Sequence, residues 1–314
     1  MALAPKLVIV TRKSALEELV LRFGTRDRAR FYIERSSGDY GAYEQAHLAY
    51  EQAESGLKAA IPPGIRAQWI DRGFLPTFVF GPGDLVITLG QDGLVVNTAK
   101  YLEAQPLIAL NPDPARIDGV LLPFTVPQAR AVIERAVAGR LTCEEVTMAE
   151  ARLNDGQYLL AVNDLFIGPK THGSARYMIR SGEREEIQSS SGVIVSTGAG
   201  STGWFRSILA GAAGVTEGFT EAVDLGSLRT DYRFPWTSKK LAFSVREPFA
   251  SRTSAATLVF GWVEPGAELR MESLMPSNGV IFSDGIEDDA LQFNSGSIAS
   301  IKASARVLRL VIPG

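Results

Sequence analysis

Short apolar runs alternate with stretches of helical periodicity in the first third of the chain. Residues 7–10 form a continuous apolar run and residues 84–89 a largely apolar one, and both are rich in β-branched side chains, as buried strands are. Residues 14–23 follow a plausible helix cap, residues 40–60 form a longer helical stretch, and residues 106–111 supply another short strand. This alternation predicts β and α elements around a largely parallel sheet, in an α/β domain of residues 1–115.

The pattern changes after Pro123. One helix is predicted at about residues 127–138, and turn signals such as Asn154-Asp155-Gly156 then separate short strand candidates. Those strands are predicted at residues 145–153, 157–167, 175–179, 193–196, 240–245, 257–263, 268–272 and 279–283. The pattern is typical of a β-sandwich, and we predict a second, β-sandwich domain at residues 116–287. The last run, residues 299–313, is apolar enough to join either domain.

Composition and charge exclude few classes of protein. The 314 residues carry a net charge of −3 with no basic block, so binding to nucleic acid has little support. The single cysteine, Cys143, excludes an internal disulfide framework and suits a reducing compartment; a small buried side chain is the favoured interpretation over a nucleophile. Residues 7–10 are too short for the apolar core of a signal peptide, and no run approaches the ~20 apolar residues that span a bilayer. We therefore expect a cytoplasmic protein with no membrane association.

A glycine turn, Gly90-Gln91-Asp92-Gly93, directly follows the buried strand at residues 84–89. Glycines let a backbone approach a ligand closely, and Asp92 could accept a proton or hold a magnesium ion. Ligands of such sheets bind beyond the carboxyl ends of the strands, where this turn lies. Because Asp-Gly is also a common turn sequence, an ordinary connection remains the alternative.

Two polar residues, Asn163 and Asp164, interrupt an otherwise apolar strand. An amide and a carboxylate together offer hydrogen-bond donors and acceptors that could bind ribose hydroxyls or an adenine edge. A bulge or a strand end facing water is the alternative interpretation.

A loop rich in glycine and hydroxyl groups, residues 196–204, lies between an apolar run and a helical one. Gly198, Gly200 and Gly203 match the pattern G-x-G-x-x-G of dinucleotide-binding sites. That fingerprint requires a βαβ unit with an acidic residue ending the second strand, and residues 215–227 contain no convincing strand. We therefore do not interpret the loop as a Rossmann phosphate site.

Taken together, these motifs resemble those of the NAD kinases, and most closely the mitochondrial-type branch. The likeness covers about residues 80–310 and rests on motifs in the same order as in that family: Gly90-Gln91-Asp92-Gly93, Asn163-Asp164, the loop 196–204 and Asp284-Gly285. Further matching segments are Leu110-Asn111-Pro112-Asp113-Pro114, Ser190-Ser191-Gly192, residues 243–249 and residues 296–300.

The resemblance implies a Rossmann-like α/β domain and a β-sandwich domain, with residues 288–314 packing back on the first. It implies transfer of the γ-phosphoryl group of ATP, with Mg²⁺, to the 2′-hydroxyl of the adenosine ribose of NAD, in a homodimer or larger oligomer. It makes Asp92 the catalytic residue. The residues that it places at the nucleotides are Gly90, Gly93, Asn163, Asp164, Thr197, Gly198, Gly200, Ser201 and Thr202. We assign no residue as a metal ligand.

Three departures from the family's pattern keep alternatives open. Gln91 replaces a glycine and Leu94 replaces a threonine of the family's Gly-Gly-Asp-Gly-Thr motif, where ATP phosphates should lie, and Asp164 is one methylene shorter than the family's glutamate. The alternatives are a catalytically weak dinucleotide-binding sensor and a related kinase that acts on another hydroxyl. Retention of Asp92 favours an enzyme.

Overall fold

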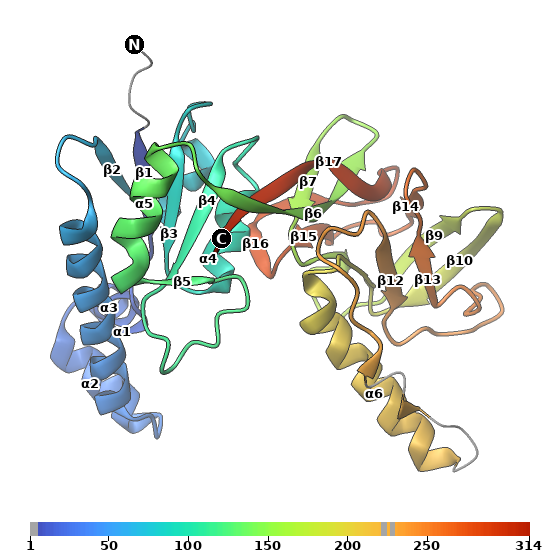
Figure 1. Ribbon diagram of the computed structural model, residues 1–314. Helices are drawn as coiled ribbons and strands as arrows, with labels where there is room; N and C mark the ends of the chain where they lie inside the picture. The colour runs from blue at the N-terminus through green and yellow to red at the C-terminus, as the bar shows by residue number, and fades with distance from the viewer. Residues whose placement is uncertain (1–5, 221–224, 227–229) are drawn as a thin grey trace. The chain divides into compact units, whose positions relative to one another are not determined.

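The computed structural model describes residues 6–220, 225–226 and 230–314, and two compact units divide the chain (Figure 1). Unit 1 contains residues 1–144 and 309–314, and unit 2 contains residues 145–308. The chain passes from unit 1 to unit 2 between residues 144 and 145. This point is later than the predicted domain boundary at 115 and 116, because the helix after residue 128 packs on the first sheet.

Unit 1 is an α/β domain, as predicted. Its parallel sheet has the strand order β4-β3-β1-β2, and β5 pairs with the end of β4. The strands are β1 (Leu7–Thr11), β2 (Ala67–Asp71), β3 (Leu85–Leu89), β4 (Pro106–Asn111) and β5 (Phe124–Thr125). The helices are α1 (Ala15–Phe23), α2 (Arg26–Arg35), α3 (Tyr40–Ala60), η1 (Arg72–Thr77), α4 (Asp92–Ala99), η2 (Val126–Gln128) and α5 (Ala129–Val137).

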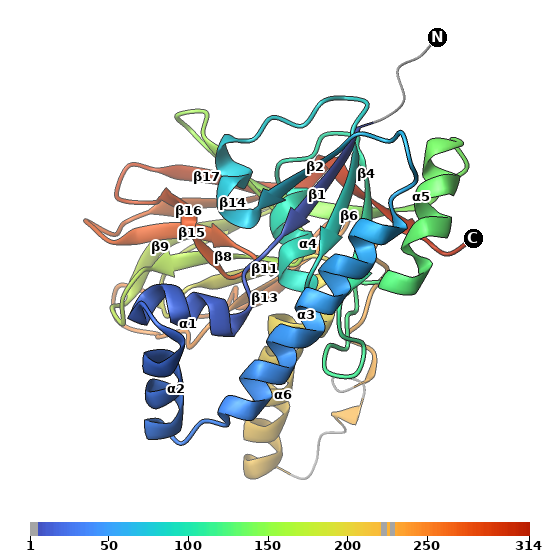
Figure 2. The ribbon, with the colours of Figure 1, turned by 90° about the vertical axis from the view of Figure 1, so that its left-hand side faces the viewer.

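Alternation of side chains along the strands gives this sheet two buried faces. Leu7, Ile87 and Ile108 pack in one cluster with residues of α3 and α5. Figure 1 shows these two helices over one face of the sheet, and α4 packs on β1 and β3 from the other face. Figure 2 shows α1 and α2 as a helical pair beside α3. The carboxyl ends of β1, β3 and β4 therefore share one edge, where α1 and α4 begin.

Unit 2 is a sandwich of antiparallel sheets, again as predicted. One sheet has the order β13-β12-β11-β8-β15-β16, and the other runs β10-β9-β14-β17 and continues through β6 to β7. Its core lies between the sheets and includes Leu165, Ile179 and Phe243. The strands are β6 (Thr142–Leu153), β7 (Tyr158–Ala161), β8 (Asp164–Pro169), β9 (Ala175–Ser181), β10 (Arg184–Ser190), β11 (Val193–Ser196), β12 (Leu241–Val245), β13 (Phe260–Val263), β14 (Leu269–Ser273), β15 (Gly279–Ser283), β16 (Ile286–Gln292) and β17 (Ile298–Ile312).

Two further segments of the chain bear on the sequence predictions. Helix α6 (Trp204–Phe219) follows the short helix η3 (Gly200–Thr202), and it extends through the start of the stretch 215–227, of which residues 221–224 and 227 lie outside the described part. The last residues of β17 belong to unit 1, where Arg309 and Leu310 pair in parallel with β4. Among the described residues, no helix is both long and apolar enough to cross a membrane.

Several elements differ from the sequence prediction. The strand predicted at residues 157–167 is broken between β7 and β8, because residues 162–163 bond to the hairpin that joins β15 to β16. Helix α4 starts two residues before the predicted Leu94. The patterns missed β10 and β16, which lie at sheet edges and carry charged side chains where a buried strand would be apolar.

Candidate functional site

Asp92 opens α4 immediately beyond the carboxyl end of β3. Its carboxylate accepts hydrogen bonds from the backbone N–H of Leu121, at 2.7 Å, and of Val120, at 3.2 Å. These bonds fix the carboxylate and hold the loop after β4 against the turn. A carboxylate offers about four acceptor positions, so half-buried Asp92 can still accept from a ligand.

The glycines beside Asp92 have different surroundings. A Cβ at Gly90 would lie 2.8 Å from Leu94 Cδ2, so the side chain of Leu94 packs closely over this glycine. A Cβ at Gly93 would meet nothing within 4 Å, because Gly93 faces open space at the start of α4. Leu94 is only 4% exposed, so the residue that replaces threonine lies in the interior and does not fill the ligand side of the turn.

Three polar contacts connect the ends of β1 and β3. The hydroxyl of Tyr50, on α3, donates to the carbonyl of Leu89 at 3.0 Å and accepts from the backbone N–H of Arg12 at 3.1 Å. Burial raises the pKa of Tyr50 to about 12, so this hydroxyl keeps its proton throughout the physiological range. Arg12 Nη1 donates to Gln91 Oε1 at 2.8 Å.

The Asn163–Asp164 turn of unit 2 is held by a carboxylate from far along the chain. Asp284 accepts from the backbone N–H of Asn163 at 2.7 Å, of Val162 at 3.0 Å and of Asp164 at 3.2 Å. Asp284 itself adopts a left-handed conformation, with φ of 55°, in the hairpin after β15. The polar pair is therefore fixed in position by its backbone, and its side chains remain available.

Asp164 is an unusual carboxyl group. It is 7% exposed, and its side chain makes no hydrogen bond to any residue that the structure describes. Burial, and secondly the charge of Asp284, raise its pKa to about 7. Asn163 is half-buried, and its side-chain amide also makes no hydrogen bond within the described residues. The turn thus presents an amide and a titratable carboxyl group to a ligand.

The glycine-rich loop after β11 packs directly on this turn. Thr197 Oγ1 donates to the carbonyl of Val162, and Thr197 N–H donates to the carbonyl of Asn163 at 2.9 Å. A Cβ on Gly200 would lie 2.1 Å from Asn163 O, so only glycine allows this approach. The G-x-G-x-x-G pattern therefore reflects close packing of two backbone segments.

The remaining loop residues have mainly structural contacts. Gly198 packs against the carbonyl of Pro235, which lies 2.1 Å from the position of a Cβ. The hydroxyl of Ser201, 1% exposed, donates to the carbonyl of Gly198 at 2.7 Å. Thr202 is half-buried, and none of the described residues accepts or donates a hydrogen bond at its hydroxyl. Of the predicted loop residues, Thr202 is the one whose side chain is left for a ligand.

A pocket of about 560 Å³ lies on the outer face of the β8–β11–β15 sheet. Its floor is aromatic: the Phe166 and Phe282 rings are 4.8 Å apart, and Trp204 stacks at 5.8 Å from Phe166. Because side chains two residues apart point to the same face of a strand, Asp164 and Phe166 share this face of β8. The aromatic floor and the polar turn are thus neighbours on one surface.

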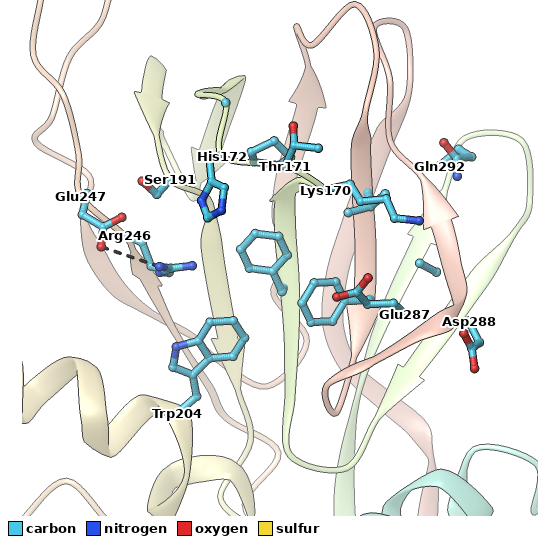
Figure 3. Close-up of a pocket in the computed structure, with 16 residues that line it drawn as sticks. Lys170, Thr171, His172, Ser191, Trp204, Arg246, Glu247, Glu287, Asp288 and Gln292 are labelled. Carbon is cyan, nitrogen blue, oxygen red and sulfur yellow. Dashed lines mark ion pairs between the residues drawn. The ribbon is translucent and has the colours of Figure 1, made fainter. Parts of the chain in front are cut away.

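Polar side chains surround that floor, as Figure 3 shows. Arg246 lies over the Trp204 ring, 5.4 Å from its centroid, and pairs with Glu247 at 3.7 Å. His172 faces the pocket from the loop after β8, while Lys170 and Glu287 lie on the opposite side of the view. The pocket combines surfaces for stacking a flat ring with groups of both charges.

Comparison with known proteins gives a consistent set of relatives. No protein-family model matches the chain. A probable NADH kinase of Oryza sativa subsp. japonica is 24% identical over 254 residues, which cover 73% of this chain and 71% of the relative. An NAD kinase of Heliobacterium modesticaldum is 34% identical over 130 residues, covering 38% of this chain and 44% of that protein.

Solved structures extend the likeness to the whole chain. Yeast NADH kinase complexed with NADH superposes with a TM-score of 0.58 at 15% identity, over 100% of this chain and 85% of that one. An NAD kinase from Archaeoglobus fulgidus in complex with ATP gives 0.53 at 13% identity, over 97% and 92%. The fold is that of the NAD(H) kinases. The NAD kinase-like fold expected from the sequence motifs is thereby confirmed.

Within this NAD kinase fold, the described residues bring no three His, Cys, Asp or Glu side chains together as a metal cage. Mg²⁺ bound with a nucleotide needs only one or two carboxylates, because phosphate oxygens and water supply its other ligands. Asp92 is the carboxylate at the unit 1 turn and fits that smaller requirement.

Sequence reasoning identified the Asp92 turn, the Asn163–Asp164 turn and the loop that packs on it. It noted Asp284 only as part of a family motif and missed Arg12. Both act across more than 70 residues of sequence, since Arg12 bonds to Gln91 and Asp284 bonds to Asn163. The available signal for Arg12 was its position at the carboxyl end of the first strand.

Proposed function

We propose that this protein is an ATP-dependent NAD kinase, which transfers the γ-phosphoryl group of ATP to the 2′-hydroxyl of the adenosine ribose of NAD and forms NADP. One observation carries the proposal: the Asn163–Asp164 turn is clamped by Asp284 through the backbone, while both side chains lack partners among the described residues. The kinship with NAD(H) kinases supports the same conclusion.

The turn suits the acceptor nucleotide. Ribose hydroxyls donate hydrogen bonds, and the carboxylate of Asp164 is an acceptor with no competing partner. The amide of Asn163 can donate and accept at once, as recognition of an adenine edge requires. Thr202 and the backbone of the Gly198–Gly200 segment complete the proposed dinucleotide contacts.

The aromatic pocket offers a place for a flat ring. Phe166 and Phe282 present stacked faces beside the polar turn, and ring stacking favours such offset arrangements. We propose that one ring of the dinucleotide stacks there.

We propose that Asp92 acts as the base in the phosphoryl transfer. In the reaction the acceptor oxygen forms a bond to the γ-phosphorus, the bond from that phosphorus to the bridging oxygen breaks, and ADP leaves. The acceptor hydroxyl loses its proton, which the carboxylate of Asp92 can accept. Phosphoryl transfer depends mainly on positioning and charge stabilisation, so one fixed carboxylate is sufficient as the base. When bound with ATP, Mg²⁺ would neutralise charge on the phosphates, and Asp92 is the residue that could contact it.

Three further parts of the proposal rest on the family resemblance alone or on composition. They are the use of Mg²⁺, assembly as a homodimer or larger oligomer, and a cytoplasmic location. Gly90 and Gly93 belong to the proposed ATP turn, where Gly93 leaves open space for a phosphate.

The second candidate is a dinucleotide-binding sensor without kinase activity. Gln91 favours it, because this residue adds a side chain to the turn at which the family has glycine. The two candidates differ in one observable property, the formation of NADP.

The test is incubation of the purified protein with ATP, MgCl₂ and NAD, followed by enzymatic detection of NADP. We expect NADP from the native protein and a loss of about 10²-fold or more in kcat for Asp92→Asn. Asp27→Asn is the matched control, because Asp27 is exposed in the first turn of α2. Native rates in Asp92→Asn would exclude Asp92 as the base.

A binding measurement separates the candidates. NAD should raise the melting temperature of the native protein and of Asp92→Asn, but much less that of Asn163→Ala. NAD-dependent stabilisation without any NADP would reject the kinase and favour the sensor. Unchanged stabilisation in Asn163→Ala would remove that residue from the site.

A further inference from the structure

A small pocket lies beside the Gly90 turn, entirely within unit 1. It measures about 280 Å³, and its lining includes Arg12, Gln91, Asp113 and Arg116. Whole-ligand clefts usually measure ~300–1,000 Å³. A pocket of this size would therefore hold one part of a nucleotide, such as its phosphates.

Only one of the basic groups at this edge lacks an acidic partner among the described residues. Arg116 pairs with Asp113 at 2.6 Å, and Lys13 pairs with Asp71 at 3.4 Å. The guanidinium of Arg12 instead donates to neutral oxygens, those of Gln91 and of the Lys13 carbonyl. Its positive charge is thus not compensated locally, and it retains donors for an anion.

Gln91 helps to fix the position of the Arg12 guanidinium. Its Oε1 accepts from Arg12 Nη1 at 2.8 Å, and it is the residue immediately before Asp92. A neutral amide orients a guanidinium without neutralising it, whereas a carboxylate in the same place would do both. A glycine at position 91 could do neither.

Gly90 and Leu94 allow this arrangement. A Cβ on Gly90 would lie 3.5 Å from Arg12 Cδ and 2.8 Å from Leu94 Cδ2, so the stem of Arg12 crosses the turn on the side that glycine leaves open. Because Leu94 is buried, it does not compete for the space in front of the guanidinium.

We propose that Arg12, oriented by Gln91, binds the phosphate groups of the nucleotide donor at the turn that carries Asp92. This inference rests on the proposed kinase function, and it gives Gln91 a role where the family's motif has glycine. Arg12 would supply a charged hydrogen-bond donor on the ligand side of this turn. Gln91 is a positioning residue, and Arg12 contacts the donor.

The experiment measures the dissociation constant of MgATP by calorimetry and the separate KM values for ATP and NAD. For Arg12→Ala we expect MgATP affinity to fall about tenfold or more, because a charge-assisted hydrogen bond is lost. For Gln91→Leu, which keeps the size of the side chain, we expect a loss of about threefold to tenfold. The KM for NAD should stay within twofold of the native value in both. Arg28→Ala, exposed on α2, is the control and should behave as the native protein.

Folding does not confound this test, since Arg12 bonds to Tyr50 through its backbone N–H, which alanine retains. Native MgATP affinity in Arg12→Ala, or an equal loss of NAD and ATP affinity, would overturn the inference. Failure of the kinase proposal is distinguishable: the native protein would form no NADP, and weaker MgATP binding by Arg12→Ala would still support the phosphate site.

Discussion

Replacing Asp164 by asparagine should stabilise the protein at neutral and alkaline pH while weakening its binding of NAD. The pKa of this carboxyl is raised from 3.8 to about 7, so ionisation in the folded state is unfavourable. A difference of about three pH units corresponds to about 4 kcal/mol. The asparagine side chain carries no charge at any pH, so the variant avoids this cost.

The sign of the pH dependence follows from linkage. Below pH 4 the carboxyl is protonated in both the folded and unfolded states, and Asp164 carries no ionisation penalty. Between pH 4 and pH 7 the unfolded chain releases the proton and the folded protein keeps it, so native stability falls by about 1.4 kcal/mol per pH unit. Above pH 7 the loss is complete. The stability of Asp164→Asn relative to the native protein should therefore rise over this window and then level off.

Urea unfolding followed by circular dichroism, at pH 4.5 and at pH 8, measures this difference. Asp155→Asn is the matched control, because Asp155 is an exposed carboxyl in the β6–β7 hairpin. The native and Asp164→Asn curves should separate by several kcal/mol more at pH 8 than at pH 4.5. A constant separation at the two values would refute the argument that burial dominates this group.

The remaining predictions concern the contacts that shape the same region. Gly200→Ala should destabilise unit 2 by about 3 kcal/mol or more, because its Cβ would lie 2.1 Å from the carbonyl oxygen of Asn163. Gly214→Ala, at a site in α6 where an added Cβ would meet nothing within 4 Å, should be neutral or stabilising in the same urea-unfolding assay; equal losses would contradict the packing argument. Asp284→Asn should lower the pKa of Asp164, because a neighbouring negative charge is removed. If ionised Asp164 accepts from ribose, NAD affinity in Asp284→Asn should then persist to lower pH than in the native protein, and an unshifted profile in a folded variant would rule out this coupling.

The local pattern of apolar and polar residues was sufficient to predict most of the helices and strands. Buried strands such as β3 and β11 are short, largely apolar runs, and the helix cap at Ser14 is visible as a capping box with Glu17. These signals depend on neighbours within a few residues, so the sequence displays them directly. Edge strands β10 and β16 were missed, since a strand with an exposed, charged side has no distinct periodicity.

The sequence by itself determined the two kinds of domain, the likeness to NAD kinases and the residues Asp92, Asn163 and Asp164. Tertiary structure decided what these residues can do. Asp164 titrates near neutral pH because folding buries it beside Asp284, which lies 120 residues away. Arg12 meets Gln91 across 79 residues of chain, because parallel strands bring their carboxyl ends to one edge of the sheet. Burial and long-range hydrogen bonds set the pKa and the position of a side chain. Neither burial nor a long-range hydrogen bond can be inferred from residues that are neighbours in the sequence.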